Sequence, residues 1–200
     1  MAPIIDYYMT PSSPWTYLGS ERFTQIARAA GATVNVYPVN YGKIFPATGG
    51  LPLPKRAPER RAYRMMELKR WAKFLNMPII FEPTHFPSTA PIPSLAITAA
   101  RTHGLDALTL SNAILAALWV DDRDIDDPEV ISQICIEVGL DGPNIVAQAQ
   151  TEAIADQMAA DTDRAMAAGV FGAPSYVIDG EVFWGQDRVD FVARKLDEIT

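Results

Sequence analysis

The stretch of this sequence best suited to chemistry is Thr10–Leu18, TPSSPWTYL, which holds two serine hydroxyls and two prolines. It follows a short apolar run, IIDYYM, that is typical of a buried strand, and it leads into a helical pattern of apolar residues. Ser13 is a favoured helix N-cap, and Pro14 suits the first helical position. A hydroxyl at a helix N-terminus lies beside free backbone N–H groups and the positive end of the helix dipole. It can therefore donate to an anion such as a thiolate.

The same serine has a simpler interpretation. Ser is among the favoured N-cap residues, so the residues taken alone favour Ser13 as a cap with no chemical role. Ser12 is best explained as a turn residue.

The sequence offers little for thiol or metal chemistry. Its one cysteine, Cys135, lies in the apolar helical pattern VISQICIEVG, so no internal disulfide can form and we expect a small core residue. His85 and His103 are isolated from other metal-ligand types, and His103 precedes Gly104 in the manner of a helix C-terminus. We therefore expect no metal site.

Composition narrows the class of partner. The 200 residues carry a net charge of −7 with a pI near 4.8, which disfavours nucleic-acid and anionic-membrane surfaces. No window approaches the roughly eighteen apolar residues of a membrane span, and the N-terminus lacks a secretory pattern. We expect a soluble, cytoplasmic protein with no membrane or nucleic-acid partner.

The first forty residues predict a β-α-β unit: a strand over 3–9, a helix over 14–30 and a strand over 33–39. Residues 40–60 are rich in Gly and Pro and predict a long, functional loop. Residues 78–93 predict an irregular connector. The predicted helices of the middle block cover 58–76, 92–103, 105–119, 127–138 and 142–149, followed by one that runs from Ile145 or Thr151 to Ala168.

The last thirty residues predict a Gly-rich turn, a strand SYVI, a hairpin turn at Asp179-Gly180, a strand EVFW and a closing helix QDRVDFVARKLDEI. The order β-α-β, helical block, α-β-β-α, with a Pro just before the third strand, is the thioredoxin topology. We expect an α/β thioredoxin-like domain of residues 1–40 and 151–200, interrupted by an all-helical insertion with its leading loop over 41–150.

In such folds the active site lies at the start of the first helix and faces the loop that carries the proline. Ser13-Pro14-Trp15-Thr16 stands where dithiol oxidases of the DsbA family, which this chain resembles, carry Cys-x-x-Cys. Disulfide exchange needs thiolates. With hydroxyls at both positions, the site could instead activate a thiol that a cofactor brings.

More closely, the chain resembles the 2-hydroxychromene-2-carboxylate isomerase family, relatives of the kappa-class glutathione transferases. The resemblance covers nearly the whole chain, and its most specific piece is GVFGAPSYVIDGEVFWGQDRVDFV. Its other pieces, in chain order, are YYMTPSSPWTYLG, GGLPLPKRAPERRAYRMMELKRWAKFLNMPIIF, THFP and LWVDDRDIDDPEVI.

The resemblance implies glutathione as the cofactor, with Ser13 holding its thiol as thiolate. It also implies a cis bond before Pro174, and pairing of the Ala173 backbone with the cysteinyl group of glutathione. Gln186 and Asp187 fall where the family holds the γ-glutamyl end, although Asp is also common at a helix start as a cap.

One position departs from the related transferases. They carry an Asn that contacts glutathione in the loop before the insertion, whereas TGGLP places Gly50 there. Binding by this loop must then come from backbone atoms or from another side chain, such as Lys43. A basic cluster could meet a carboxylate substrate, although a solvated helix face explains it equally well. Its members are Arg56, Arg60, Arg61 and Arg64.

The activity implied by the resemblance is the glutathione-dependent conversion of 2-hydroxychromene-2-carboxylate to trans-o-hydroxybenzylidenepyruvate in bacterial naphthalene breakdown, by a homodimer acting on an aromatic keto acid. A kappa-like glutathione transferase, which consumes glutathione, is the main alternative. A non-catalytic binding module that uses the same groove is a further one. The missing cysteines weigh against a dithiol oxidase.

Overall fold

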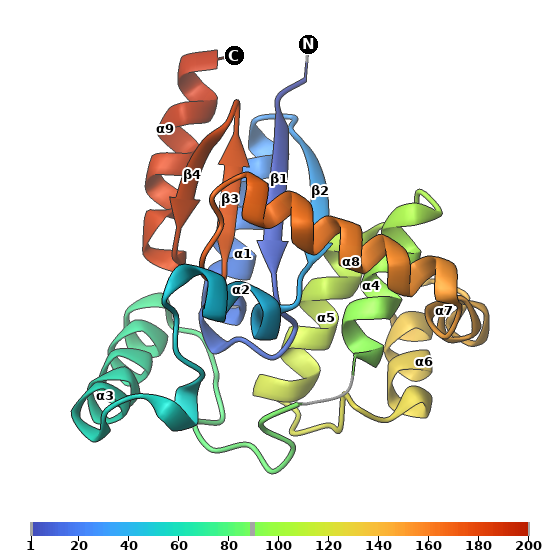
Figure 1. Ribbon diagram of the computed structural model, residues 1–200, viewed down its shortest axis with the longest axis horizontal. Coiled ribbons are helices and arrows are strands. Elements are labelled where there is room, and N and C mark those ends of the chain that lie inside the picture. Colours follow the sequence, from blue (N-terminus) through green and yellow to red (C-terminus); the bar gives the residue numbers. More distant parts are fainter. Residues whose placement is uncertain (1, 89–90, 200) are drawn as a thin grey trace.

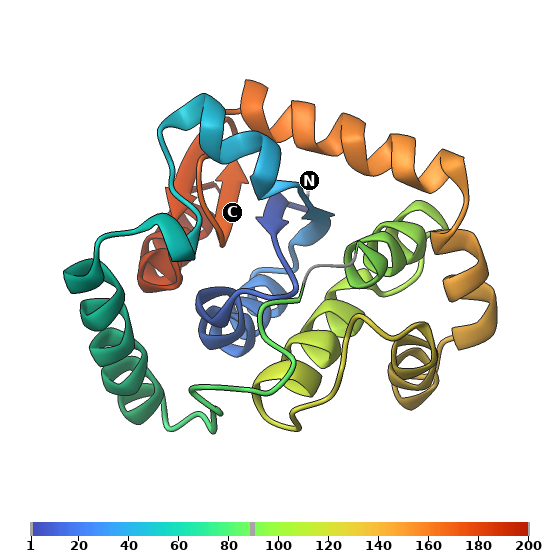
Figure 2. The same cartoon turned by 60° about the horizontal axis from the view of Figure 1, so that its bottom comes forward.

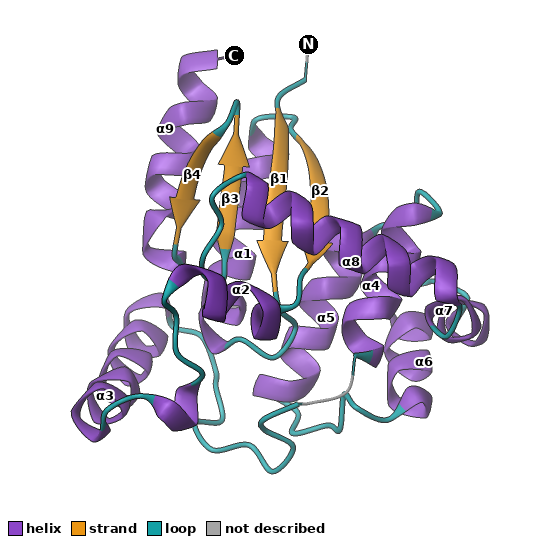
Figure 3. Ribbon diagram, viewed as in Figure 1, coloured by secondary structure: helices purple, strands orange, loops and turns teal. Residues whose placement is uncertain are grey.

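The computed structural model describes residues 2–88 and 91–199, and in these ranges a mixed sheet has the strand order β2-β1-β3-β4 (Figures 1 and 3). The central strand β1, Ile4–Met9, pairs parallel with β2, Thr33–Pro38. On its other side β1 pairs antiparallel with β3, Ser175–Ile178. Strand β4, Glu181–Trp184, pairs antiparallel with β3 at the edge. The predicted thioredoxin-like α/β class with a helical insertion is confirmed.

Side chains of β1 alternate between two cores, because successive residues of a strand point to opposite faces. Tyr7 packs against Phe23 of α1, Pro14–Ala29, with ring centres 4.7 Å apart. Tyr8 points the other way and stacks on Tyr37 of β2 at 5.1 Å. Figure 1 shows α8, Glu152–Ala167, crossing that second face in front of the sheet.

Helix α1 begins as its sequence predicts. The Ser13 Oγ accepts the Thr16 N–H at 3.2 Å, and Pro14 occupies the first helical position. The helix ends just before Gly31, whose φ of +61° lies in the left-handed region that favours glycine.

The expectation that residues 40–60 form a long loop is wrong. This segment forms α2, Tyr41–Thr48, and a 3₁₀ turn, Leu53–Lys55. The Asn40 side chain caps α2 by accepting the Gly42 N–H at 2.9 Å, and Ile44 is fully buried. Gly and Pro lower intrinsic helix propensity, but packing of an apolar face stabilises this short helix.

The helices of the insertion follow their predicted boundaries closely. Thr151 is the N-cap residue of α8, which decides between its two expected starts. Cys135 is fully buried, and His103 is the C-cap of α4, so both expectations are confirmed. The helices are α3 Pro58–Leu75, α4 Ile92–Thr102, α5 Ala107–Trp119, α6 Pro128–Glu137 and α7 Gly142–Ala149.

Two further features concern α3 and the closing helix of the chain. Figure 2 shows α3 standing apart from the group formed by α4 to α7. The closing helix, expected from residue 186, begins as a 3₁₀ turn, Gln186–Arg188, that continues into α9, Val189–Ile199. Within the described ranges, no helix is both long and apolar enough to cross a membrane.

A buried ion pair joins α4 to α8. Asp161 is 1% exposed and binds the Arg101 guanidinium, which also lies 4.5 Å from the Tyr37 ring centre. Gln157 donates a further hydrogen bond to Asp161 at 3.0 Å. Burial raises the pKa of the Asp161 carboxyl, and Arg101 opposes that rise. Loss of the carboxylate would leave Arg101 without its counter-charge in a largely buried position.

We expect Asp161→Ala to lower the free energy of unfolding by roughly 3 kcal/mol, because breaking a buried pair leaves an uncompensated charge. Asp163→Ala is the matched control: it makes the same change two residues along α8, where Asp163 pairs with Lys43 and the two side chains are 61% and 49% exposed. That variant should lose about 1 kcal/mol at most. Urea unfolding measures both, and equal losses would contradict the assigned role of the buried pair.

Candidate active site

Ser13 leaves one hydrogen-bond donor unused at the start of α1. Its oxygen accepts the Thr16 N–H, while its own hydrogen has no acceptor in the described part of the chain. Ser12 differs, because its hydroxyl pairs with the Thr10 hydroxyl at 3.3 Å. Pro14 has no N–H, so the Trp15 N–H is the other first-turn donor without an acceptor among the described residues. These two donors, at the positive end of a helix, suit an anion.

The loop before β3 presents a free peptide edge. The Ala173–Pro174 bond is cis, as expected, and the Pro174 carbonyl accepts the Gly185 N–H at 2.9 Å. The Gly172 carbonyl accepts hydrogen bonds from the Tyr41 and Ser175 hydroxyls. Ala173 itself has neither its N–H nor its carbonyl bonded within the described ranges. An extended ligand could pair with it as an added strand.

These elements meet at a cleft of about 400 Å³. It brings together three of the expected residues, Ala173, Gln186 and Asp187, beside Trp15, two positions after Ser13. In Figure 1, α3 lies below the end of β4 and the start of α9, and its side chains Tyr63, Glu67 and Trp71 line the cleft. The cleft is lined by Trp15, Tyr63, Glu67, Trp71, Ala173, Trp184, Gly185, Gln186, Asp187 and Arg188.

Gln186 carries a buried polar atom in need of a partner. The residue is 2% exposed, and its side-chain carbonyl Oε1 has no hydrogen bond within the described structure. Buried polar groups are nearly always hydrogen-bonded, so this acceptor beside a cleft suits a hydrogen-bond donor of a ligand. Gly185, with a φ of +110°, makes the turn that brings Gln186 inward.

Two residues of α1, Gly19 and Arg22, hold Gln186 in place, and the sequence patterns did not predict this role. The Arg22 Nη2 donates to the Gln186 backbone carbonyl at 2.6 Å. A Cβ at Gly19 would come within 3.0 Å of the Gln186 Cβ and of the Tyr176 hydroxyl oxygen, so glycine permits this close packing. A glycine in the middle of a helical pattern can indicate close packing against another segment, so Gly19 could have predicted this contact.

Charge in the cleft is mixed. Asp187 pairs with Arg188 at 2.6 Å, and Glu67 pairs with Arg70 on α3. Burial, reinforced by the charge of Arg56, lowers the pKa of Arg64. None of the four arginines expected to form a substrate-binding cluster lines the cleft among the described residues, namely Arg56, Arg60, Arg61 and Arg64.

Lys43 and Gly50 also do not line the cleft. The Lys43 ammonium is bound to Asp163 at 2.5 Å. Gly50 follows α2, and a Cβ there would lie 2.5 Å from the Phe45 ring. Any side chain at this position would therefore displace the Phe45 ring.

The aromatic walls of the cleft were not predicted from the sequence. Tyr63 and Trp71 are eight positions apart on α3 and so share one helix face, while Trp184 comes from β4. No local pattern connects these residues with Trp15, because they converge only through tertiary packing.

Comparison with known proteins agrees with this geometry. The model of the DSBA-like thioredoxin domain matches residues 4–197. The chain belongs to the DSBA-like thioredoxin domain family. A 2-hydroxychromene-2-carboxylate isomerase from Sphingobium xenophagum is 26% identical over 194 residues, which cover 96% of this chain and 97% of the relative. Glutathione S-transferase kappa 1 from Caenorhabditis elegans is 25% identical, over 98% of this chain and 92% of the relative.

A solved structure of a 2-hydroxychromene-2-carboxylate isomerase superimposes with a TM-score of 0.83 at 21% identity, covering 98% of this chain and 95% of that one. The expected resemblance to this family and to kappa-class transferases is therefore confirmed at the level of fold and relatives.

This DSBA-like domain has no thiol available at its site. Cys135 lies in α6, fully buried, and burial raises the pKa of its thiol to about 11. Because the thiolate is the reactive form, Cys135 is a poor nucleophile near neutral pH. No group of three potential metal ligands occurs within the described ranges either, and His85 lies 3.6 Å from a single carboxylate, that of Asp124.

We expect the Cys135 thiol to react with Ellman's reagent at least about a hundredfold more slowly in the native protein than in urea. A rise in pKa of about two units reduces the thiolate fraction by that factor, and burial slows the reaction further. Absorbance of the released thionitrobenzoate measures both rates. Rapid, stoichiometric labelling of the native protein would contradict this assignment.

Proposed function

We propose that this protein is a glutathione-dependent isomerase that converts 2-hydroxychromene-2-carboxylate to trans-o-hydroxybenzylidenepyruvate, or a close analogue. The observation that carries the proposal is the unused hydrogen of the Ser13 hydroxyl, at a helix N-terminus beside an aromatic cleft. Relatives that bear this isomerase name align over nearly the whole chain. As part of the same proposal, the protein acts as a cytoplasmic homodimer on an aromatic keto acid in hydrocarbon catabolism.

The residues around the cleft fit glutathione. The free N–H and carbonyl of Ala173 suit the extended backbone of its cysteinyl residue. The unpartnered Oε1 of Gln186 and the carboxylate of Asp187 suit the ammonium group of its γ-glutamyl end. Lys43 is bound to Asp163 and is not needed for this arrangement.

When bound, glutathione supplies a thiol nucleophile that can add reversibly to a conjugated carbon and leave unchanged. The protein keeps that sulfur ionised: the Ser13 hydroxyl and the Trp15 N–H donate to it, and the dipole of α1 favours negative charge there. Trp15 and Trp71 offer apolar ring surface to a flat substrate. The cleft around them excludes water from part of the substrate.

A kappa-like glutathione transferase is the second candidate, because a kappa-class transferase also aligns over nearly the whole chain. A transferase would retain the same donors but form a stable conjugate. A binding module would fill the cleft without turnover.

Thiol balance distinguishes these functions. The substrate is incubated with the protein and glutathione, its absorbance is followed, and the remaining thiol is titrated. Conversion with an unchanged thiol concentration supports the isomerase, whereas loss of one thiol per substrate supports the transferase. Saturable glutathione binding with neither reaction would support the binding module.

For Ser13→Ala we expect the thiol pKa of bound glutathione to rise by roughly one to two units. A hydrogen bond to a charged group contributes about 1.5–3 kcal/mol, and about 1.36 kcal/mol corresponds to one pKa unit. The turnover rate should fall most at a pH below the wild-type thiol pKa, and the deficit should shrink as the pH rises through the pKa of the variant. Ultraviolet absorbance of the thiolate, titrated against pH, measures the shift.

Two further variants separate thiolate binding from helix capping. Ser12→Ala removes the neighbouring hydroxyl, which pairs with Thr10, and should leave the titration unchanged. Ser13→Asp keeps an N-cap acceptor but offers no donor when ionised, so it should preserve stability while raising the thiol pKa. Superimposable titrations for the wild type and Ser13→Ala would reduce Ser13 to a cap.

A further inference from the structure

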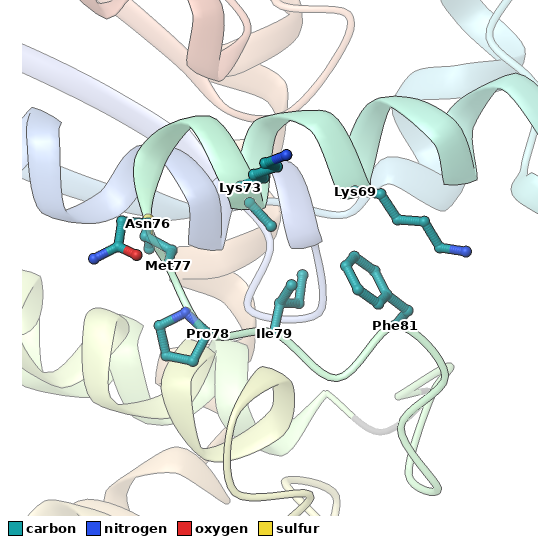
Figure 4. A pocket seen from close by; sticks show the side chains of 8 residues that line it. Lys69, Lys73, Asn76, Met77, Pro78, Ile79 and Phe81 are labelled. Carbon is teal, nitrogen blue, oxygen red and sulfur yellow. The ribbon is translucent and has the colours of Figure 1, made fainter.

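The outer side of α3 borders a second cavity, of about 640 Å³, that the proposed function does not use (Figure 4). The end of α3 and the chain that follows it line this cavity, which is open to solvent. Its lining residues are Lys69, Ala72, Lys73, Asn76, Met77, Pro78, Ile79 and Phe81.

Helix geometry places this cavity on the opposite face of α3 from the cleft. Successive helical residues are rotated by about 100°, so Glu67 and Lys69 point about 200° apart, as do Trp71 and Lys73. The Glu67 and Trp71 side chains line the cleft, whereas both lysines line the outer cavity. One helix therefore separates two distinct sites.

The floor of the outer cavity is fixed in place. The Met77 N–H donates to the Ala72 carbonyl at 3.0 Å, and the Tyr17 hydroxyl of α1 donates to the Pro78 carbonyl at 2.6 Å. The Ile80 N–H donates to the Trp119 carbonyl at 2.7 Å. These bonds tie the segment to α3, α1 and α5, so the cavity is preformed, as ligand sites usually are.

The chemistry of the lining combines apolar surface with positive charge. Met77, Ile79 and Phe81 are half-buried, and the Lys69 ammonium lies 5.8 Å from the Phe81 ring centre. Neither Lys69 nor Lys73 forms an ion pair within the described ranges. No Asp or Glu lines the cavity among the described residues, although the chain carries a net charge of −7.

We propose that the outer cavity binds an aromatic carboxylate, with its ring against Met77, Ile79 and Phe81 and its carboxylate between Lys69 and Lys73. A ring gains from contact with the Phe81 ring and the Met77 thioether. Figure 4 shows both lysine side chains on α3 above this apolar segment. This site does not rest on the glutathione-dependent activity and can be tested without it.

The test compares 2-naphthoate with 2-naphthamide, which has the same rings but no charge, by isothermal titration calorimetry. The acid should bind more tightly than the amide. Lys69→Met and Lys73→Met should each weaken naphthoate binding by about threefold, and the double variant by about tenfold, as expected for exposed ion pairs. Arg28→Met is the charge-matched control: Arg28 is exposed near the end of α1, and its loss should leave both affinities unchanged.

A second readout locates the ligand. The methyl NMR signal of Met77 should shift on addition of naphthoate, while Tyr63→Ala, a change in the cleft wall, should leave the affinity unchanged. Equal binding of acid and amide, or lysine variants that bind naphthoate as the wild type does, would overturn the proposal. Weakened binding in Tyr63→Ala with no effect of the lysine variants would place the ligand in the cleft and also overturn it.

Discussion

The antiparallel register of β1, β3 and β4 is the constraint on which the site depends. Tyr8, near the end of β1, lies opposite Ser175, the first residue of β3, and Ser175 lies opposite Trp184, the last residue of β4. The segments that carry Ser13, Ala173 and Gln186 therefore leave or enter the sheet at the same end. A shift by one residue would also turn Tyr7 out of its core, so burial of one sheet face secures the register and with it the site.

The helical insertion supplies the part of the cleft that the thioredoxin-like core does not form. The thioredoxin-like core supplies polar groups and a free peptide edge, and α3 supplies the aromatic wall with Tyr63 and Trp71. Because α3 borders cavities on two faces, a change in its position would alter both. The buried pair of Arg101 and Asp161 joins α4 of the insertion to α8.

Replacing thiols by hydroxyls at the start of α1 changes the chemistry that the same geometry can support. A hydroxyl remains protonated near neutral pH and donates a hydrogen bond, whereas a lowered-pKa thiol becomes the nucleophile itself. The helix dipole and the Trp15 N–H can stabilise a thiolate in both cases, whether the sulfur belongs to the protein or to a ligand. Under the proposed function, this DSBA-like fold acts on a thiol that a ligand brings in.

The sequence by itself determined the local features: the Ser13 cap and Pro14 start of α1, the strand pattern of β1, and the hairpin of β3 and β4, because these depend on neighbours in the chain. The helix α2 was missed, since Gly42 and Pro46 lower helix propensity and the burial of Ile44 is a tertiary effect. The aromatic cleft and the role of Arg22 were decided by tertiary structure alone. Each joins residues far apart in the chain, and no periodicity in one segment encodes which side chain of another it will meet.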